Sequence, residues 1–81
     1  MSDDYQPIDC GLYDEYELAI MHKRPLDLQV TEAGAVTIRR VEPLDTSVAD
    51  GAEYLVCRDI RTDESLRLRL DRIRMLTDDR Y

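Results

Sequence analysis

Pro25 divides the sequence into two segments with different hydrophobic periods. Ahead of it, apolar residues recur at the spacing i, i+4, i+7 and i+8, which places them on one face of an α-helix. These residues are Leu12, Tyr16, Ala19 and Ile20, with Met21 at the flank. From Leu26 onward, apolar and polar residues alternate, as expected of half-buried β-strands. Because proline ends a helix, the sequence predicts a helix over about residues 11–23 and strands over about residues 26–76.

The alternating segment contains five predicted strands. They cover Leu26–Thr31, Ala35–Val41, Glu53–Ile60, Leu66–Leu70 and Ile73–Leu76. Val36 and Ile38 are expected to point inward, and the apolar run at Tyr54–Cys57 predicts a central, more buried third strand. The longest predicted loop is Glu42–Gly51, which is rich in Pro, Gly and short polar residues.

A chain of 81 residues has room for one small domain with a single core. One helix followed by five short strands predicts a mostly β fold over residues 1–81, a small and strongly bent antiparallel barrel. Exposed sheet edges tend to pair with other chains, so a chain this short is expected to close its sheet.

The acidic residues are concentrated at the start of the chain. Residues 1–22 hold six of the 18 Asp and Glu residues and none of the 11 Lys and Arg residues, and the whole chain has a net charge of −7. This charge opposes direct binding to nucleic acid, because phosphate groups carry the same sign. It suits a basic protein partner, and it equally suits a surface whose charge serves only solubility.

Three residues of the predicted helix lie off its apolar face and share one surface, namely Tyr13, Asp14 and Glu17. Asp9 or Cys10 is the expected N-cap, and Asp is the better of the two chemically. Acids early in the helix and basic residues at its end suit the helix dipole. The pattern therefore predicts a helix that packs by one face and presents acids and a tyrosine on another.

The residues form no recognisable catalytic or metal-binding pattern, so we expect a protein that is not an enzyme and has no cofactor. Cys10 and Cys57 are expected to be buried or half-buried thiols in a reducing cytosol, and one His with two distant Cys is too few for a metal site. The first residues do not resemble a signal peptide, and no segment has 18 consecutive apolar residues. These features predict a cytoplasmic protein with no contact to a membrane. Asp3–Asp4 is expected to be a solvated pair. Asp78–Asp79 resembles a catalytic carboxylate pair, but neighbours on a frayed tail cannot be held in catalytic geometry.

Four segments of the chain resemble one known family. They are Tyr5-Gln6-Pro7-Ile8-x-Cys10, Tyr13-Asp14-x-x-Glu17-Leu18-Ala19, Glu53-Tyr54-Leu55-Val56 and Leu66-Arg67-Leu68-x-Leu70-Asp71-x-Ile73. In order and spacing they are similar to the signature of the Rho-binding antiterminator (Rof) family.

This resemblance implies an Sm-like five-stranded barrel preceded by a helix. It also implies a protein that binds the N-terminal RNA-binding domain of the transcription termination factor Rho, which has an OB-type fold, and that blocks RNA loading there. By position in the motif, Tyr13, Asp14 and Glu17 are the leading contact residues. Asp9 and Glu15 are added from their charge alone. We expect the isolated protein to be a monomer.

Two other functions remain open from the sequence. An Sm-like RNA-binding module would use a basic face, and the one basic cluster is the stretch Arg67–Arg74, interrupted by Asp71. The other is an acidic adaptor for another basic OB-fold protein.

Overall fold

The change of period at Pro25 separates a helix from a sheet in the computed structural model, which describes residues 5–76. The helix is α1 (Cys10–Met21), and the strands are β1 (Leu26–Glu32), β2 (Ala35–Ala49), β3 (Ala52–Asp59), β4 (Ser65–Arg69) and β5 (Ile73–Met75). A short 3-10 helix, η1 (Leu70–Arg72), separates β4 from β5. The pairs Asp3–Asp4 and Asp78–Asp79 lie outside the described residues.

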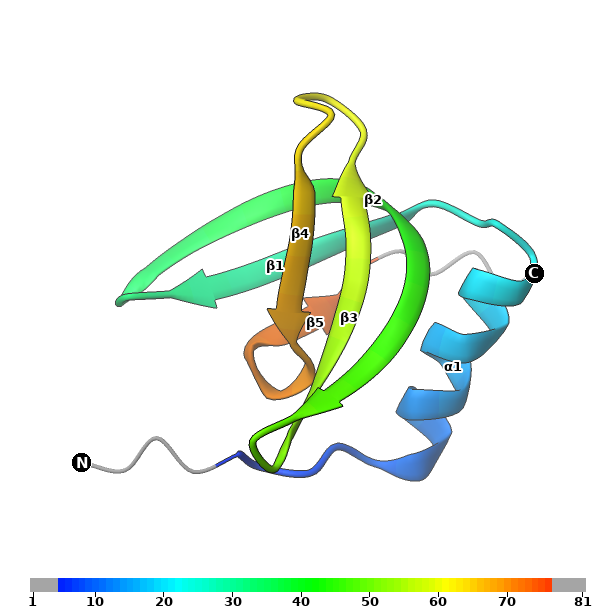
Figure 1. The fold of residues 1–81 in the computed structure, drawn as a ribbon. Coiled ribbons are helices and arrows are strands. Elements are labelled where there is room, and N and C mark those ends of the chain that lie inside the picture. Colours follow the sequence, from blue (N-terminus) through cyan, green and yellow to red (C-terminus); the bar gives the residue numbers. More distant parts are fainter. Residues whose placement is uncertain (1–4, 77–81) are drawn as a thin grey trace.

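The five strands form one antiparallel sheet in the order β4-β3-β2-β1-β5. β2 curves strongly, so that the sheet wraps into a barrel-like shape (Figure 1). The predicted fold class, mostly β with one N-terminal helix and a small five-stranded barrel, is confirmed. The expectation of full closure is wrong, because β4 and β5 are the two outer strands and do not pair with each other. Both outer strands are short, which itself limits pairing with other chains.

The core lies between α1 and the concave side of the sheet. Its buried residues are Tyr16, Ala19, Leu26, Leu28, Val30, Val41, Leu55, Cys57, Leu68, Leu70 and Ile73. Leu12 and Ile20 are partly buried at its margin, so the predicted apolar face of the helix is the face that packs. β3 pairs with strands on both sides and alternates buried with half-buried residues, which confirms its predicted central position.

β2 is much longer than predicted, because most of the predicted loop Glu42–Gly51 belongs to it. Pro43 pairs with Cys57 of β3, and the register then shifts before Asp45 pairs with Val56. Leu44, the residue after the proline, is left out of the pairing, and a β-bulge is one of the strand positions where proline is tolerated. The true turn is Asp50–Gly51, where both residues have positive φ, 51° and 77°.

Val36 and Ile38 do not point into the core. Their side chains are 58% and 56% exposed. They pair with Thr31 and Gln29 of β1, while the core residue Leu28 pairs with Arg39. Because side chains of a strand alternate between the two faces, this register places the two apolar residues on the outer face. The prediction for them is therefore wrong.

The ends of α1 differ from the prediction in three details. The helix begins at Cys10, which is exposed and not buried as expected. It ends at Met21, so His22 to Arg24 lie beyond its last turn. The first turn holds no acidic residue. Of the acids predicted to suit the helix dipole, only the cap residue, Asp9, therefore lies at the N-terminal end of the helix within the described residues.

Candidate functional site

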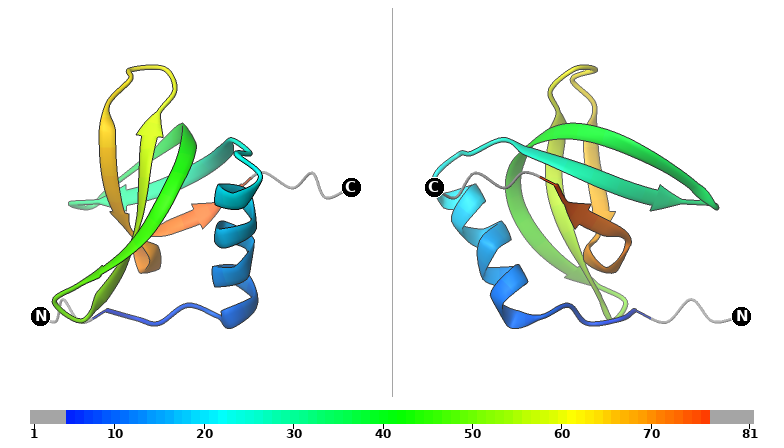
Figure 2. Two further views of the ribbon diagram at one scale, coloured as in Figure 1. Left: turned by 45° about the vertical axis from the view of Figure 1, so that its right-hand side comes forward. Right: turned by 180° about the vertical axis from the view of Figure 1, so that it is seen from behind.

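The chain before α1 fixes where the helix starts. The side chain of Asp9 accepts a hydrogen bond from the backbone N–H of Gly11 at 3.0 Å, which confirms Asp9 as the N-cap. Further upstream, the Tyr5 hydroxyl donates to Glu53 Oε1 of β3, and the Gln6 backbone N–H donates to Asp71 Oδ2, both at 2.9 Å. This segment runs along one end of the sheet before the helix begins (Figure 2). Both ends of the segment are therefore anchored, and α1 has a fixed starting point.

Three of the predicted contact residues, Asp14, Glu15 and Glu17, are exposed on α1. Asp9 is also exposed, although its carboxylate is engaged in capping. Two apolar side chains lie among these acids, Leu18 at 45% and Met21 at 68% exposure. Spacings of three and four residues place Asp14, Glu17, Leu18 and Met21 next to one another on the helix surface. We call these four residues the acidic–apolar face of α1.

Tyr13 differs from the other predicted contacts. It is half-buried and packs against the core, and its hydroxyl donates to Thr46 Oγ1 of β2 at 3.3 Å. The ring therefore lies at the boundary between α1 and β2, one helix turn before Glu17. The structure brings Asp14 and Glu17 together on an open surface and leaves Tyr13 at its edge.

The acids of α1 and the acids of the sheet differ in their partners. On the sheet and its connecting segments, ion pairs join Arg39 to Asp59 and Glu64, Arg40 to Asp27, Arg58 to Glu42 and Asp63, and Arg69 to Asp71. Within residues 5–76, Asp14, Glu15 and Glu17 form no ion pair. Their charge is not neutralised locally, so it acts on whatever approaches this side of the molecule.

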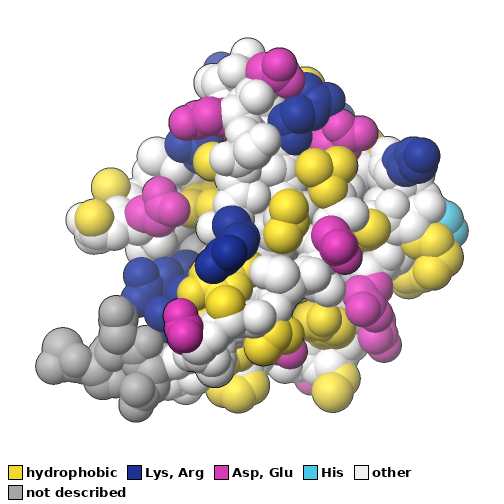
Figure 3. All heavy atoms as spheres, viewed as in Figure 1, with side chains coloured by type: hydrophobic (Ala, Val, Ile, Leu, Met, Phe, Trp, Pro, Cys, Tyr) yellow, Lys and Arg dark blue, Asp and Glu magenta, His cyan; other side chains and the backbone are white. Residues whose placement is uncertain are grey.

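A shallow groove of about 280 Å³ adjoins the acidic–apolar face, between α1 and β2. Its lining residues are Glu17, Ile20, Met21, Asp45 and Thr46. On the side of the molecule seen in Figure 3, acidic and apolar side chains lie close together around α1 and the neighbouring part of β2. The sequence did not reveal Asp45 as a site residue, because the position fell in the predicted loop. The sequence analysis also did not predict that Leu18 and Met21 are exposed site residues. For Leu18, the spacing of four residues from Asp14 could have indicated that the two share one helix surface.

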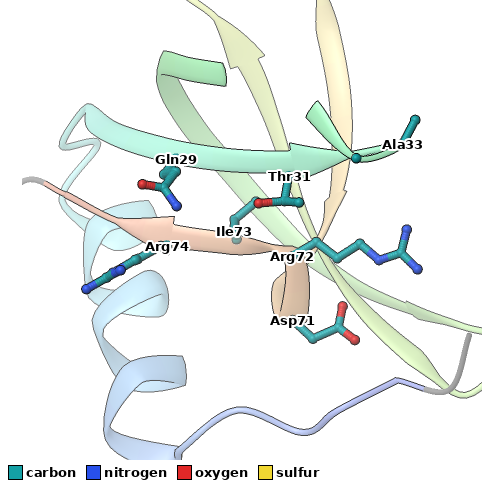
Figure 4. A pocket seen from close by; sticks show the side chains of 8 residues that line it. Gln29, Thr31, Ala33, Asp71, Arg72, Ile73 and Arg74 are labelled. Carbon is teal, nitrogen blue, oxygen red and sulfur yellow. The ribbon is translucent and has the colours of Figure 1, made fainter. Parts of the chain in front are cut away.

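A second groove of about 560 Å³ lies between β1 and β5. Its lining residues are Gln29, Thr31, Ala33, Gly34, Asp71, Arg72, Ile73 and Arg74. Gln29 and Thr31 extend from β1 toward β5, while Arg72 and Arg74 point toward opposite ends of the groove (Figure 4). None of the predicted contact residues lines it.

The second cysteine, Cys57, is buried, and its thiol is not activated for reaction. Burial, followed by the nearby charge of Asp59, raises the pKa of Cys57 to about 11, so the thiol stays protonated near neutral pH. Among the residues that the structure describes, no group of three or more His, Cys, Asp and Glu side chains is arranged to hold a metal ion. No helix within residues 5–76 has both the length and the apolarity to cross a membrane.

Comparison with known proteins gives one family match and two similar relatives. A family model described as the WYL domain matches residues 11–78. Protein rof of Escherichia coli (strain K12) and Protein rof of Shigella flexneri are each 36% identical to this chain over 73 residues, which is 90% of this chain and 81% of theirs. No solved structure matches the chain significantly.

Proposed function

Because this chain belongs to the Rof family, with residues 11–78 matching the WYL domain, we propose that it inhibits Rho-dependent transcription termination by binding Rho. Membership of the family supports a Rho-related role in transcription antitermination. The finer proposal is that the acidic–apolar face of α1 occupies the RNA-binding surface of the N-terminal domain of Rho. The protein then acts by binding alone, without catalysis.

The observation that carries this proposal is the unpaired charge of α1. Asp14, Glu15 and Glu17 form no ion pair within residues 5–76, although arginines neutralise many acids of the sheet. A surface that binds single-stranded RNA is basic and offers platforms for base stacking. The acidic–apolar face of α1 is complementary to both features of such a surface. Its carboxylates take the place of the RNA phosphates, and the exposed side chains of Leu18 and Met21 take the place of the apolar faces of the bases.

A reconstituted transcription reaction tests the function itself. Purified Rho and RNA polymerase transcribe a template with a Rho-dependent terminator, and this protein is added in increasing amounts. We expect read-through to rise with its concentration. Unchanged termination at a large molar excess would refute the proposal.

A competition measurement tests the site on Rho. A labelled pyrimidine-rich RNA is bound to Rho, and this protein is titrated into the complex. If the two ligands share a surface, the RNA is released as the protein binds. A stable complex of Rho, RNA and this protein together would mean that the protein binds elsewhere on Rho. Any loss of termination would then need a mechanism other than competition with RNA.

The groove between β1 and β5 favours one second candidate, an Sm-like RNA-binding module, because it presents Arg72 and Arg74. The net charge of −7 opposes it. A gel-shift assay with the chain alone separates the two candidates. Specific RNA binding that is lost in Arg74→Ala would favour the module, and absence of RNA binding is expected for a Rho inhibitor.

A further inference from the structure

We infer that the groove between α1 and β2 receives one long basic side chain, an arginine or a lysine, from Rho. This inference rests on the proposed function and adds a second element, β2, to the contact surface. Asp45 then becomes a contact residue, although it lies outside the helix and outside the motif that the family shares.

The floor of the groove is apolar. Ile20 is partly buried and packs against the core, while Met21 is 68% exposed at the margin. Arginine and lysine carry aliphatic stems that pack along apolar surfaces while their charged ends stay at a polar edge. Methionine adapts its shape to such a stem, because its side chain is unbranched and polarisable.

Two carboxylates line the same groove, and they come from different elements. Glu17 belongs to α1 and Asp45 to β2; both residues are exposed, and neither forms an ion pair within residues 5–76. Asp45 Oδ1 accepts a hydrogen bond from the Thr46 backbone N–H at 2.8 Å, which restrains the carboxylate. A cationic side chain lying on the apolar floor would meet opposite charge on both the helix and the strand. This charge complementarity selects a basic occupant over an apolar one.

The walls of the groove are held in place before any partner binds. The hydrogen bond from the Tyr13 hydroxyl to Thr46 Oγ1 joins α1 to β2 beside the groove. On the strand, Asp45 directly follows the bulge that begins at Pro43, and bulges commonly redirect the side chains next to them. A site that is already formed loses little conformational entropy on binding.

The test compares two charge-removing variants of β2 in their affinity for the Rho hexamer. Asp45→Asn keeps the acceptor for the Thr46 N–H and removes the charge inside the groove. Asp50→Asn removes the same charge at the β2–β3 turn, where asparagine tolerates positive φ. We expect Asp45→Asn to raise the Kd for Rho about tenfold or more, as for loss of a hydrogen bond to a charged group. Asp50→Asn should leave the Kd nearly unchanged.

A second pair of variants tests the apolar lining of the groove. Met21→Ala shortens the exposed side chain in the groove, and Val36→Ala does the same to a side chain of similar exposure on the outer face of the sheet. Met21→Ala is expected to raise the Kd about fivefold, because apolar area is lost from the contact, without changing the dependence of binding on salt. Asp45→Asn should lower that dependence.

The outcomes separate this inference from the function on which it depends. If wild-type protein binds Rho and Asp45→Asn binds with the same affinity, the groove is not a contact and the inference is wrong, while the function stands. If Asp45→Asn and Asp50→Asn weaken binding equally, the effect is general electrostatic attraction, and the inference is again overturned. If wild-type protein fails to bind Rho, the proposed function itself fails.

Discussion

The hydroxyl of Tyr13 in α1 donates a hydrogen bond to Thr46 Oγ1 in β2 across 3.3 Å. These residues are 33 positions apart in the chain, and the bond links the helix directly to the long curved strand. The same tyrosine belongs to the segment that resembles the family signature. Its position indicates that the tyrosine helps to hold α1 against β2.

Tyr13→Phe removes this hydrogen bond and keeps the ring in place. We expect the free energy of unfolding, measured by urea denaturation, to fall by about 0.5–1.5 kcal/mol, with a small loss of Rho affinity. Tyr13→Ala should lower both further, because the packing of the ring is also lost. If Tyr13→Phe is as stable as wild type yet fails to bind Rho, the hydroxyl contacts Rho directly and the positioning role is refuted.

Binding to Rho should weaken markedly as salt concentration rises. The proposed contact uses exposed carboxylates, and mobile ions screen such charges over ~8–10 Å near physiological ionic strength. Titrations by calorimetry at several NaCl concentrations measure the effect. An affinity that stays constant from low to high salt would mean that the interface is mainly apolar, and Leu18 and Met21 would then be its main contacts.

Leu28→Ala and Ile38→Ala test the register of β1 and β2. Leu28 is fully buried, whereas Ile38 is 56% exposed on the outer face. Truncation of the buried residue opens a cavity and should lower stability by about 2–5 kcal/mol. Truncation at the exposed position should change it by no more than about 0.5 kcal/mol. Thermal unfolding of both variants is the measurement, and equal losses would contradict the orientation of β2.

Acid should destabilise the fold partly through Asp59. Hydrogen bonds from the backbone N–H groups of Thr62 and Arg61, together with Arg39, hold the pKa of Asp59 below its usual range despite its burial. A carboxyl with a lowered pKa in the folded state adds stability above its unfolded pKa of about 3.9, and this stability is lost as pH falls through the folded pKa.

The variant Asp59→Asn isolates that contribution. We expect it to be less stable than wild type at pH 7 and to show a shallower loss of stability between about pH 4 and pH 2. Urea unfolding at a series of pH values measures both slopes. Parallel pH profiles for the two proteins would show that other carboxyl groups account for acid unfolding.

The local pattern of the sequence was sufficient to predict some features of this structure. The spacing of Tyr16 and Ala19 predicts the packed face of α1, the chemistry of Asp9 predicts its cap, and strict alternation from Leu26 to Val30 predicts β1. In each case the residue's neighbours in the chain determine its surroundings. The exposure of Asp14 and Glu17 follows from the same helical geometry.

Other features depend on contacts between distant strands. Pro43 reads as a loop residue, but pairing with β3 accommodates it in a bulge and extends β2 by several residues. Val36 and Ile38 alternate as a core strand would, and only the register with β1 decides which face they occupy. Asp45 joins the site for the same reason, since β2 has to continue past the bulge before this residue comes near α1.

The affinity for Rho of variants with a single charge reversal tests the central claim most directly. Asp14→Lys and Glu17→Lys reverse charge on the acidic–apolar face, and Glu32→Lys makes the same change at an exposed position at the end of β1. All three side chains are exposed, so stability should change by only about 0.5 kcal/mol, which circular dichroism and thermal unfolding verify. We predict that each reversal on α1 abolishes or strongly weakens binding to Rho in a calorimetric titration, while Glu32→Lys binds almost as wild type does. Normal binding by folded Asp14→Lys and Glu17→Lys would contradict the assignment of α1 as the Rho-binding surface.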